Sequence, residues 1–183
     1  MKAGTVASRV RFYIRDTSKN ITSDWEIYES INEALRIVAE VNSKSKGGIF
    51  RKSETIVISD GKGLLPEDFL DVNRVFSSDG KEMLAVFSST PGTLEYSTDG
   101  MYIYSGEPSV TIFYFSFHPQ ILNDISDIEI PESYFTMLAR ATALVVSGDP
   151  NGAMNLVLSI LTGTPMEASG NGMEASGDGG DGK

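Results

Sequence analysis

The sequence predicts an α+β protein in which helices from the N- and C-terminal regions form a bundle and a central antiparallel β-hairpin-rich insertion stands off it. Apolar residues recur with helical spacing near both ends of the chain. Between residues 49 and 117 the period switches to two, and Asp-Gly pairs separate short β-branched and aromatic runs. With 183 residues, 40% hydrophobic and 22% charged, the chain has the composition of a globular domain. We therefore expect a single α+β domain over residues 1–162.

Two helices are expected before the β-rich region, over residues 5–15 and 24–42. The first has an apolar stripe of Val6, Val10, Tyr13 and Ile14, and its wetter side carries Arg9, Arg11 and Arg15. Ser23 and Glu26 have the spacing of a capping box, which satisfies free N–H groups where the second helix begins. The second core stripe is expected to comprise Ile27, Ile31, Leu35 (or Ala34) and Val38, with Trp25 and Tyr28 as large anchors near the first turn.

Two hairpins are expected within residues 49–117. Asp79-Gly80 separates the runs 72–77 and 81–87, and Asp99-Gly100 separates the runs 94–98 and 101–104. Such a pair favours a type I′ turn, in which both central residues have positive φ. An earlier strand, residues 54–59, is followed by Asp60-Gly61 as a turn signal. The last run, Val110–Phe117, is largely apolar on both faces, so we expect it to be central in the sheet or covered by another subunit.

Two further helices are expected over residues 132–147 and 150–161, because a proline beside an acidic residue is typical of a helix start. Their inward positions are Phe135, Leu138, Thr142 and Val145/Val146, and then Ala153, Leu156, Val157, Ile160 and Leu161. Residues 163–183 contain seven glycines, four acids and two copies of Met-Glu-Ala-Ser-Gly. This composition does not bury enough apolar surface to order alone, so it predicts an extended acidic tail that is disordered by itself and is ordered only where a partner or neighbouring subunit holds it.

Charge and composition exclude several functional classes. The chain has 15 Lys and Arg against 25 Asp and Glu, a net charge of −10, which disfavours global attraction to nucleic acid or anionic membranes. It has no Cys and one His, so thiol catalysis, disulfide frameworks and Cys-rich zinc sites are excluded. No phosphate-binding loop, dinucleotide fingerprint or nucleophile elbow is present, and no cofactor or metal is expected. The start lacks the order of a signal peptide and no apolar run spans a membrane, so folding in a cytoplasm is expected.

The candidate chemical residues favour structural roles. His118 precedes Pro119 without a sequence-level partner, so we expect it to be structural rather than a general base. Asp60, Asp79 and Asp99 are expected in turns and not in a calcium loop. The acids Asp124, Asp127, Glu129 and Glu132 are read as a solvated loop and helix start, with a hydrolytic carboxylate pair as the alternative. We expect the aromatic residues of the strands to form the hydrophobic core and a face between subunits, and the alternative is a platform on which a ligand stacks. These residues are Tyr96, Tyr102, Tyr104, Phe113, Tyr114, Phe115 and Phe117.

The order of several segments resembles the head-to-tail adaptor (connector, or head completion) proteins of tailed bacteriophages. The likeness covers about residues 5 to 161. Its first part is Val10-Arg11-Phe12-Tyr13-Ile14-Arg15-Asp16, followed by Ile31-Asn32-Glu33-Ala34-Leu35-Arg36 on the next helix. It continues with Leu65-Pro66-Glu67-Asp68-Phe69-Leu70 leading to Val75, with the segments 101–104 and 110–115, and with Ile130-Pro131-Glu132-Ser133-Tyr134 entering a helix.

This resemblance implies a structural virion protein without catalytic residues. Such a protein forms a homo-oligomeric ring, usually of twelve subunits, beneath the portal protein and docks a tail or nozzle protein. It would be assembled in the host cytoplasm and located in the virion neck, with DNA passing through its channel without sequence-specific binding. In related adaptors the C-terminal segment often reaches the portal. The residues expected to contact partners are Leu156, Ile160, Leu161, Met166, Met173, Tyr102 and Tyr104.

Two alternatives from other classes remain. A β-rich binding module, such as the carbohydrate-binding part of a phage tail or surface protein, would use the tyrosines and the acidic loop. It requires Tyr102, Tyr104 and Tyr114 to be exposed on one flat face. An enzyme would require His118 or two close carboxylates in a cleft.

Overall fold

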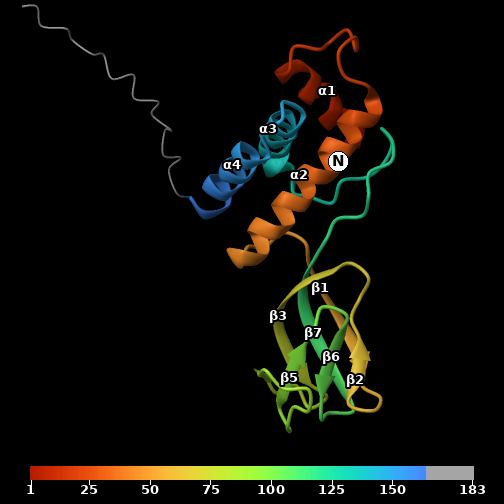
Figure 1. Ribbon diagram of the computed structural model, residues 1–183, viewed down its shortest axis with the longest axis vertical. Helices are drawn as coiled ribbons and strands as arrows, with labels where there is room; N and C mark the ends of the chain where they lie inside the picture. The colour runs from red at the N-terminus through yellow and green to blue at the C-terminus, as the bar shows by residue number, and fades with distance from the viewer. Residues whose placement is uncertain (164–183) are drawn as a thin grey trace, which may run out of the picture.

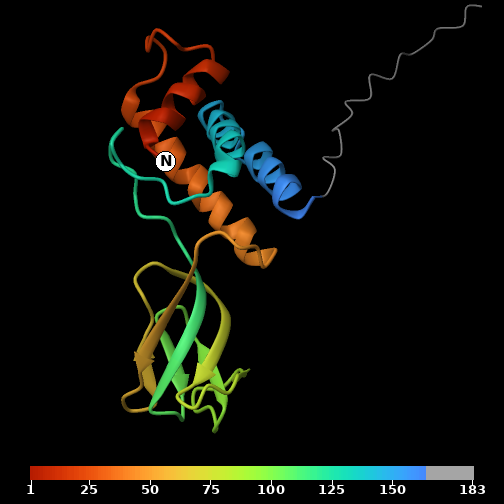
Figure 2. The same ribbon diagram turned by 180° about the vertical axis from the view of Figure 1, so that it is seen from behind.

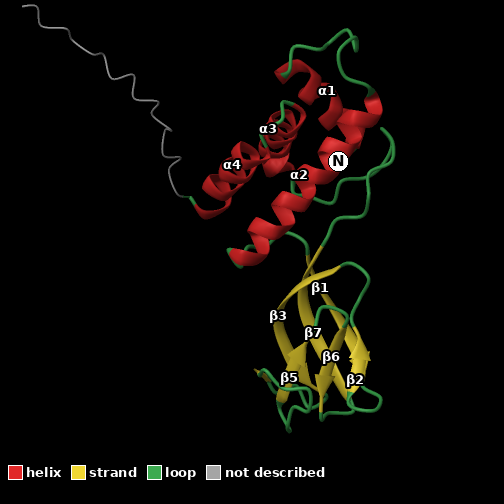
Figure 3. Ribbon diagram, in the orientation of Figure 1, coloured by secondary structure: helices red, strands yellow, loops and turns green. Residues whose placement is uncertain are grey.

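The computed structural model describes residues 1–163 and shows an α+β fold with the helices gathered at one end and the strands at the other (Figures 1 and 3). The helices are α1 (Ala3–Tyr13), α2 (Asp24–Lys44), α3 (Phe135–Val146) and α4 (Pro150–Thr162), and a 3-10 turn, η1 (Glu132–Tyr134), precedes α3. The strands are β1 (Arg51–Val57), β2 (Lys62–Leu64), β3 (Phe69–Ser77), β4 (Leu84–Ala85), β5 (Glu95–Thr98), β6 (Tyr102–Ser105) and β7 (Ser109–Ser116). Two chain segments, 45–50 and 117–131, connect the helices to the strands.

The helices enclose one hydrophobic core. α3 packs against α1, α2 and α4, and α4 also packs against α2. The predicted stripes supply this core, with Val6, Val10, Ile27, Ile31 and Leu138 almost completely buried. The capping box at the start of α2 is confirmed, since the Glu26 backbone N–H donates to the Ser23 hydroxyl and the Glu26 carboxylate accepts from the Ser23 N–H at 2.7 Å.

The strands form two sheets packed on a second core. One sheet has the order β1-β7-β3 and is antiparallel, and the other has the order β2-β6-β5-β4. The prediction that the run ending at Phe117 is central is confirmed, because β7 pairs with both β1 and β3. The core between the sheets contains Ile56, Val75, Ile103, Val110 and Ile112. Figure 2 shows the same separation of helices and strands from the opposite side.

The turns differ in part from the prediction. Asp60 and Gly61 both have positive φ, 53° and 77°, so the type I′ conformation occurs here. In Asp79-Gly80 and Asp99-Gly100 only the glycine has positive φ, so the prediction of type I′ turns at these two pairs is wrong. At Gly80 the Ser77 carbonyl accepts from the Gly80 N–H and the Ser77 N–H donates to Lys81, which is the pattern of a three-residue hairpin loop.

The two expected hairpins also differ from each other. The pair around Asp99-Gly100 is formed, since β5 and β6 are antiparallel. After the Gly80 turn, however, only Phe76 and Glu82 form an antiparallel bridge. The chain then leaves β3, and β4 pairs in parallel with β5. The run 81–87 is therefore not the continuous hairpin strand that the sequence predicts.

The helix bounds shift at both ends of the chain. α1 spans Ala3–Tyr13 instead of 5–15, because the Ala3 and Gly4 N–H groups donate to the loop carbonyls of Ser126 and Asp124. α2 continues to Lys44 instead of ending at 42. The helix expected over 132–147 begins as η1 and ends at Val146, and the one expected over 150–161 ends at Thr162. The predicted tail beyond Gly163 lies outside the described residues.

Candidate interaction surfaces

The loop between α1 and α2 lies at the end of the helices farthest from the strands (Figure 1), and we call the exposed apolar side chains on it and on the adjoining helix ends the apolar tip. It is formed by Phe12 at the end of α1, Ile21 in the loop and Trp25 at the start of α2, with exposed fractions of 60%, 78% and 69%. The expectation that Trp25 is a core anchor is wrong, because the core stripe of α2 starts only at Ile27. Phe12 lies off the predicted stripe of α1, which was a usable signal of its exposure. Bulky apolar groups gathered at one solvent-exposed end indicate a contact surface.

A buried charge network holds this tip in shape. Arg11, expected on the wetter side of its helix, is only 4% exposed because it is surrounded by acceptors. It donates at 2.8 Å to the carboxylates of Asp16 and Asp24 and to the Thr22 carbonyl. Desolvation raises the pKa of Asp16, but the backbone N–H groups of residues 20–22 and the charge of Arg11 outweigh it and hold the pKa below its ordinary value. The loop is thereby fixed around an ionised carboxylate.

A second apolar surface runs along the outer side of α4. Met154 and Leu158 are spaced four residues apart, so they share this face, and they are 37% and 43% exposed. Ile160 is 44% exposed but lies on a different face of the helix, two residues from Leu158. Leu156 and Leu161, predicted with Ile160 as partner contacts, are half-buried against the helical core. Leu156 also lines a shallow hollow of about 380 Å³ with Tyr13, Ile14, Arg140, Ala143, Leu144 and Ser147. The predicted contacts Met166 and Met173 lie outside the described residues.

A third set of exposed groups belongs to the strands. Val57, Leu64, Leu84 and Phe87 are all more than 60% exposed. Val57 lies at the end of β1 that pairs with Ser109, which is the end of the sheet remote from the helices. Tyr102 and Tyr104, the other predicted contacts, lie half-exposed on β6 with ring centroids 6.5 Å apart. The Tyr104 hydroxyl donates to Asp99 at 2.8 Å, and this bond is the main cause that raises the pKa of Tyr104.

The other predicted aromatics are dispersed. Tyr114 and Phe115 are 3% and 0% exposed. Tyr114 lies on β7 and donates its hydroxyl to Asp68 at 3.1 Å, and burial with this bond raises its pKa to about 12. Tyr102, Tyr104 and Tyr114 therefore do not share one exposed face. Tyr96 and Tyr104 instead line a hollow of about 560 Å³ beside β4 and β5, together with Asp71, Asp99 and Phe87.

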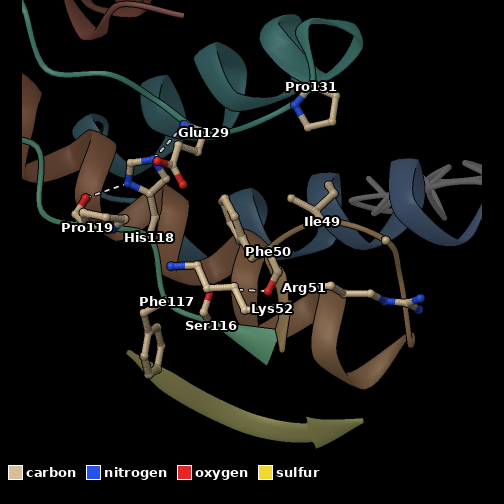
Figure 4. Close-up of a pocket in the computed structure, with 11 residues that line it drawn as sticks. Ile49, Phe50, Arg51, Lys52, Ser116, Phe117, His118, Pro119, Glu129 and Pro131 are labelled. Carbon is tan, nitrogen blue, oxygen red and sulfur yellow. Dashed lines mark hydrogen bonds between the residues drawn. The ribbon is translucent and has the colours of Figure 1, made fainter. Parts of the chain in front are cut away.

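His118 lies at the junction of helices and strands, beside a cavity of about 220 Å³ (Figure 4). Its Nε2 accepts from the Glu129 backbone N–H at 2.8 Å, so Nδ1 carries the proton and donates to the Pro119 carbonyl at 2.6 Å. Its ring also packs edge-on against Phe50, with centroids 5.6 Å apart. Burial lowers the pKa of His118, and the charge of Lys52 acts in the same direction. Both ring nitrogens are occupied by backbone groups, which is the arrangement of a structural histidine.

The acidic segment is spread along the connection 117–131 and the turn after it. Asp127 pairs with Lys2 at 2.9 Å, which lowers the pKa of Asp127, and the Glu129 backbone contacts His118. Glu132 begins η1. Within residues 1–163, no group of three or more acidic or histidine side chains is arranged to hold a metal ion. Over the same residues, no helix combines the length and apolarity needed to cross a membrane.

No protein family model matches the chain, and a comparison with curated proteins finds no match.

Proposed function

We propose that this chain is a head-to-tail adaptor of a tailed bacteriophage, a structural subunit that forms a ring between the portal and a tail or nozzle protein. The observation that carries the proposal is the exposure of bulky apolar side chains at three separate places on one subunit. A subunit that meets a different neighbour at each of several faces needs several such surfaces. In this proposal the helices form the bundle that builds the ring, and the β-rich insertion projects from it.

The two ends of the molecule are suited to two different axial partners. The tip contains Phe12, Ile21 and Trp25, and the opposite end of the strands exposes Val57. Aromatic side chains such as Trp25 are the usual anchors of protein interfaces. The tip therefore serves as one docking end. The surface around Leu84 and Phe87 lies among the strands and serves the second partner.

The outer side of α4 supplies the lateral contact between subunits. A closed ring uses heterologous contacts, in which one surface of each copy meets a different surface of the next. Met154 and Leu158 form one such surface, and the hollow that Tyr13 and Leu144 line offers a shallow apolar acceptor for it. A ring of acidic subunits, each with a net charge of −10, repels a passing DNA backbone and lets it slide.

The test is the native mass of the full-length chain, alone and mixed with the portal ring and the tail protein encoded beside it. The proposal expects discrete complexes with many copies, usually twelve, per portal. Trp25→Ser and Phe87→Ser should each remove one of the two complexes and leave the other, whereas Thr136→Ser, at an exposed polar site on α3, should remove neither. Failure to form either complex at any salt or protein concentration would overturn the proposal.

A carbohydrate-binding module is the second candidate. The exposed face of Tyr102, Tyr104 and Tyr114 that it was expected to use is not formed, but the hollow beside β4 and β5 combines Tyr96 and Tyr104 with the carboxylates of Asp71 and Asp99. Aromatic rings and carboxylates are suited to the apolar faces and hydroxyls of a sugar. Screening the full chain against immobilised glycans tests this candidate. Binding that is lost in Tyr104→Ala and kept in Tyr114→Phe would favour it over the adaptor, and absence of binding would exclude it.

A further inference from the structure

A basic and aromatic hollow lies on the outer face of the β1-β7-β3 sheet, next to the end of α2. It measures about 580 Å³ and is lined by Lys46, Arg51, Asn73, Arg74, Phe76 and Phe113. Half of these residues are cations, in a chain whose net charge is −10. None of them belongs to the surfaces used in the proposed function. We call this site the basic hollow.

Two cations of the basic hollow lie over an aromatic ring, and two form only long ion pairs. Lys46 and Arg51 lie over the ring of Phe115, at 5.6 and 5.5 Å from its centroid. The carboxylates nearest to Lys46 and Arg74 are those of Asp71 and Glu82, each at 3.8 Å. Charge-assisted hydrogen bonds are about 2.7–2.9 Å long, so both pairs are loose. The positive charges therefore remain available to an anionic ligand.

The floor of the basic hollow is aromatic. The rings of Phe76 and Phe113 meet edge-on, with centroids 5.5 Å apart, and Phe113 is 42% exposed. A suitable ligand thus combines negative charge with an apolar group a short distance away. Phosphate or a simple carboxylate would leave the rings in water, whereas a peptide with alternating acidic and apolar side chains would cover both.

We propose that the basic hollow binds the acidic C-terminal segment, residues 164–183, of the same copy. The segment contains Glu167, Glu174, Asp178 and Asp181 against one lysine. Each of its two Met-Glu-Ala-Ser-Gly copies places a methionine directly before a glutamate. The thioether of methionine packs favourably on aromatic rings, while the carboxylate pairs with Arg or Lys. The sequence of the segment therefore complements both the charge and the rings of the basic hollow.

The segment is long enough to reach its own copy's hollow. It begins after α4, which packs against α2, and Lys46 lies two residues after the end of α2. α2 has 21 residues and so is about 32 Å long. An extended segment of 20 residues spans about 66 Å. Both helices also end on the side facing the strands (Figure 1).

The observations favour a peptide over nucleic acid. Asp71 and Glu82 flank the basic hollow, and the rest of the chain is acidic, so a ligand as densely charged as a phosphate backbone is repelled on approach. A segment with four acids among 20 residues carries a much lower charge density.

The experiment uses the full-length chain with its four tail acids replaced by Glu167→Gln, Glu174→Gln, Asp178→Asn and Asp181→Asn. A fluorescent peptide with the natural sequence of residues 164–183 is titrated into it, and anisotropy is measured. We expect saturable binding that weakens with added salt. The unaltered chain should bind the peptide at least tenfold more weakly, because its own segment competes at high effective concentration.

Matched variants locate the site. Lys46→Gln with Arg74→Gln should weaken peptide binding about tenfold. Lys62→Gln is the control, because Lys62 also lies over an aromatic ring, that of Tyr102 at 4.8 Å, but on the other sheet. The Arg74→Glu variant should no longer bind the natural peptide, and it should bind a peptide that carries Glu167→Lys and Glu174→Lys.

Three results would overturn the proposal. One is equal peptide binding by the unaltered and tail-neutralised chains, and another is equal loss in the control and hollow variants. The third is a single-stranded oligonucleotide that binds through Lys46 and Arg74 more tightly than the peptide. The assay needs neither a portal nor a ring, so its outcome is independent of the proposed adaptor function.

Discussion

Asn42 pairs its side-chain amide with both backbone groups of Ile49. Its Nδ2 donates to the Ile49 carbonyl at 2.5 Å, and its Oδ1 accepts from the Ile49 N–H at 3.1 Å, all of it buried. Asn32, on the same helix, makes the same pair of bonds to Ile121, at 3.0 and 2.7 Å. The two asparagines of α2 thus fasten the two segments that connect helices to strands.

Asn42→Ala is expected to destabilise the protein by about 2–3 kcal/mol, because it leaves two buried backbone groups of Ile49 without partners. Urea unfolding measures the change. Asn155→Ala, at an exposed position of α4, is the control and should stay within about 0.5 kcal/mol of the parent. Equal effects at the two sites would contradict the role given to Asn42.

Acid should lower the free energy of unfolding through protonation of His118. Because its folded pKa is lowered below the ordinary 6.5, the unfolded chain binds the proton more readily. The contribution of neutral His118 is fully present above pH 6.5 and is lost as pH falls from there through the folded pKa. Urea unfolding across this range should show a smaller pH dependence for His118→Gln than for the parent. Identical slopes would show that protonation of His118 is not coupled to folding.

Alkali should reveal Tyr114 as a late-ionising tyrosine. Burial and its bond to Asp68 raise its pKa to about 12. Between pH 10 and 12 the unfolded chain loses this proton and the folded chain retains it, so stability falls as pH rises through that window. In ultraviolet titration, Tyr114→Phe should remove a tyrosinate step near pH 12. If an earlier step disappears instead, the assignment is wrong.

Leu158→Ser should weaken self-association about tenfold without unfolding the chain, because Leu158 is 43% exposed on α4. Sedimentation at several concentrations measures the association, and thermal unfolding verifies the fold. Asn155→Ser alters a neighbouring exposed position of the same helix and should leave association unchanged. Association unaffected by Leu158→Ser would remove α4 from the lateral contact.

The local signals in the sequence predicted most elements but not their partners. The capping box of Ser23 and Glu26 and the stripe from Ile27 are confirmed because neighbouring residues decide them. Arg11 was misplaced because Asp16 and Asp24 come to it only through a folded loop. The parallel pairing of β4 with β5 is equally non-local, since a nine-residue connection separates them and short strands carry no register signal.

The same limit applies to the candidate surfaces. An exposed tryptophan and a buried one look alike in a list of apolar residues, and the exposure of Trp25 follows only from where the α2 core stripe begins. The basic hollow joins cations from the end of α2 and the strands β1 and β3, so no spacing in the chain indicates it. His118 was predicted to be structural, and in the structure both of its ring nitrogens bond to backbone groups.

The two asparagine pairs also have a mechanical consequence. Asn32 and Asn42 are ten residues apart, which is about 15 Å along α2. A sideways force on the strands therefore acts on this helix at two separated points rather than at a single hinge. Two fastenings separated along one helix resist tilting of the strands more than a single hinge would.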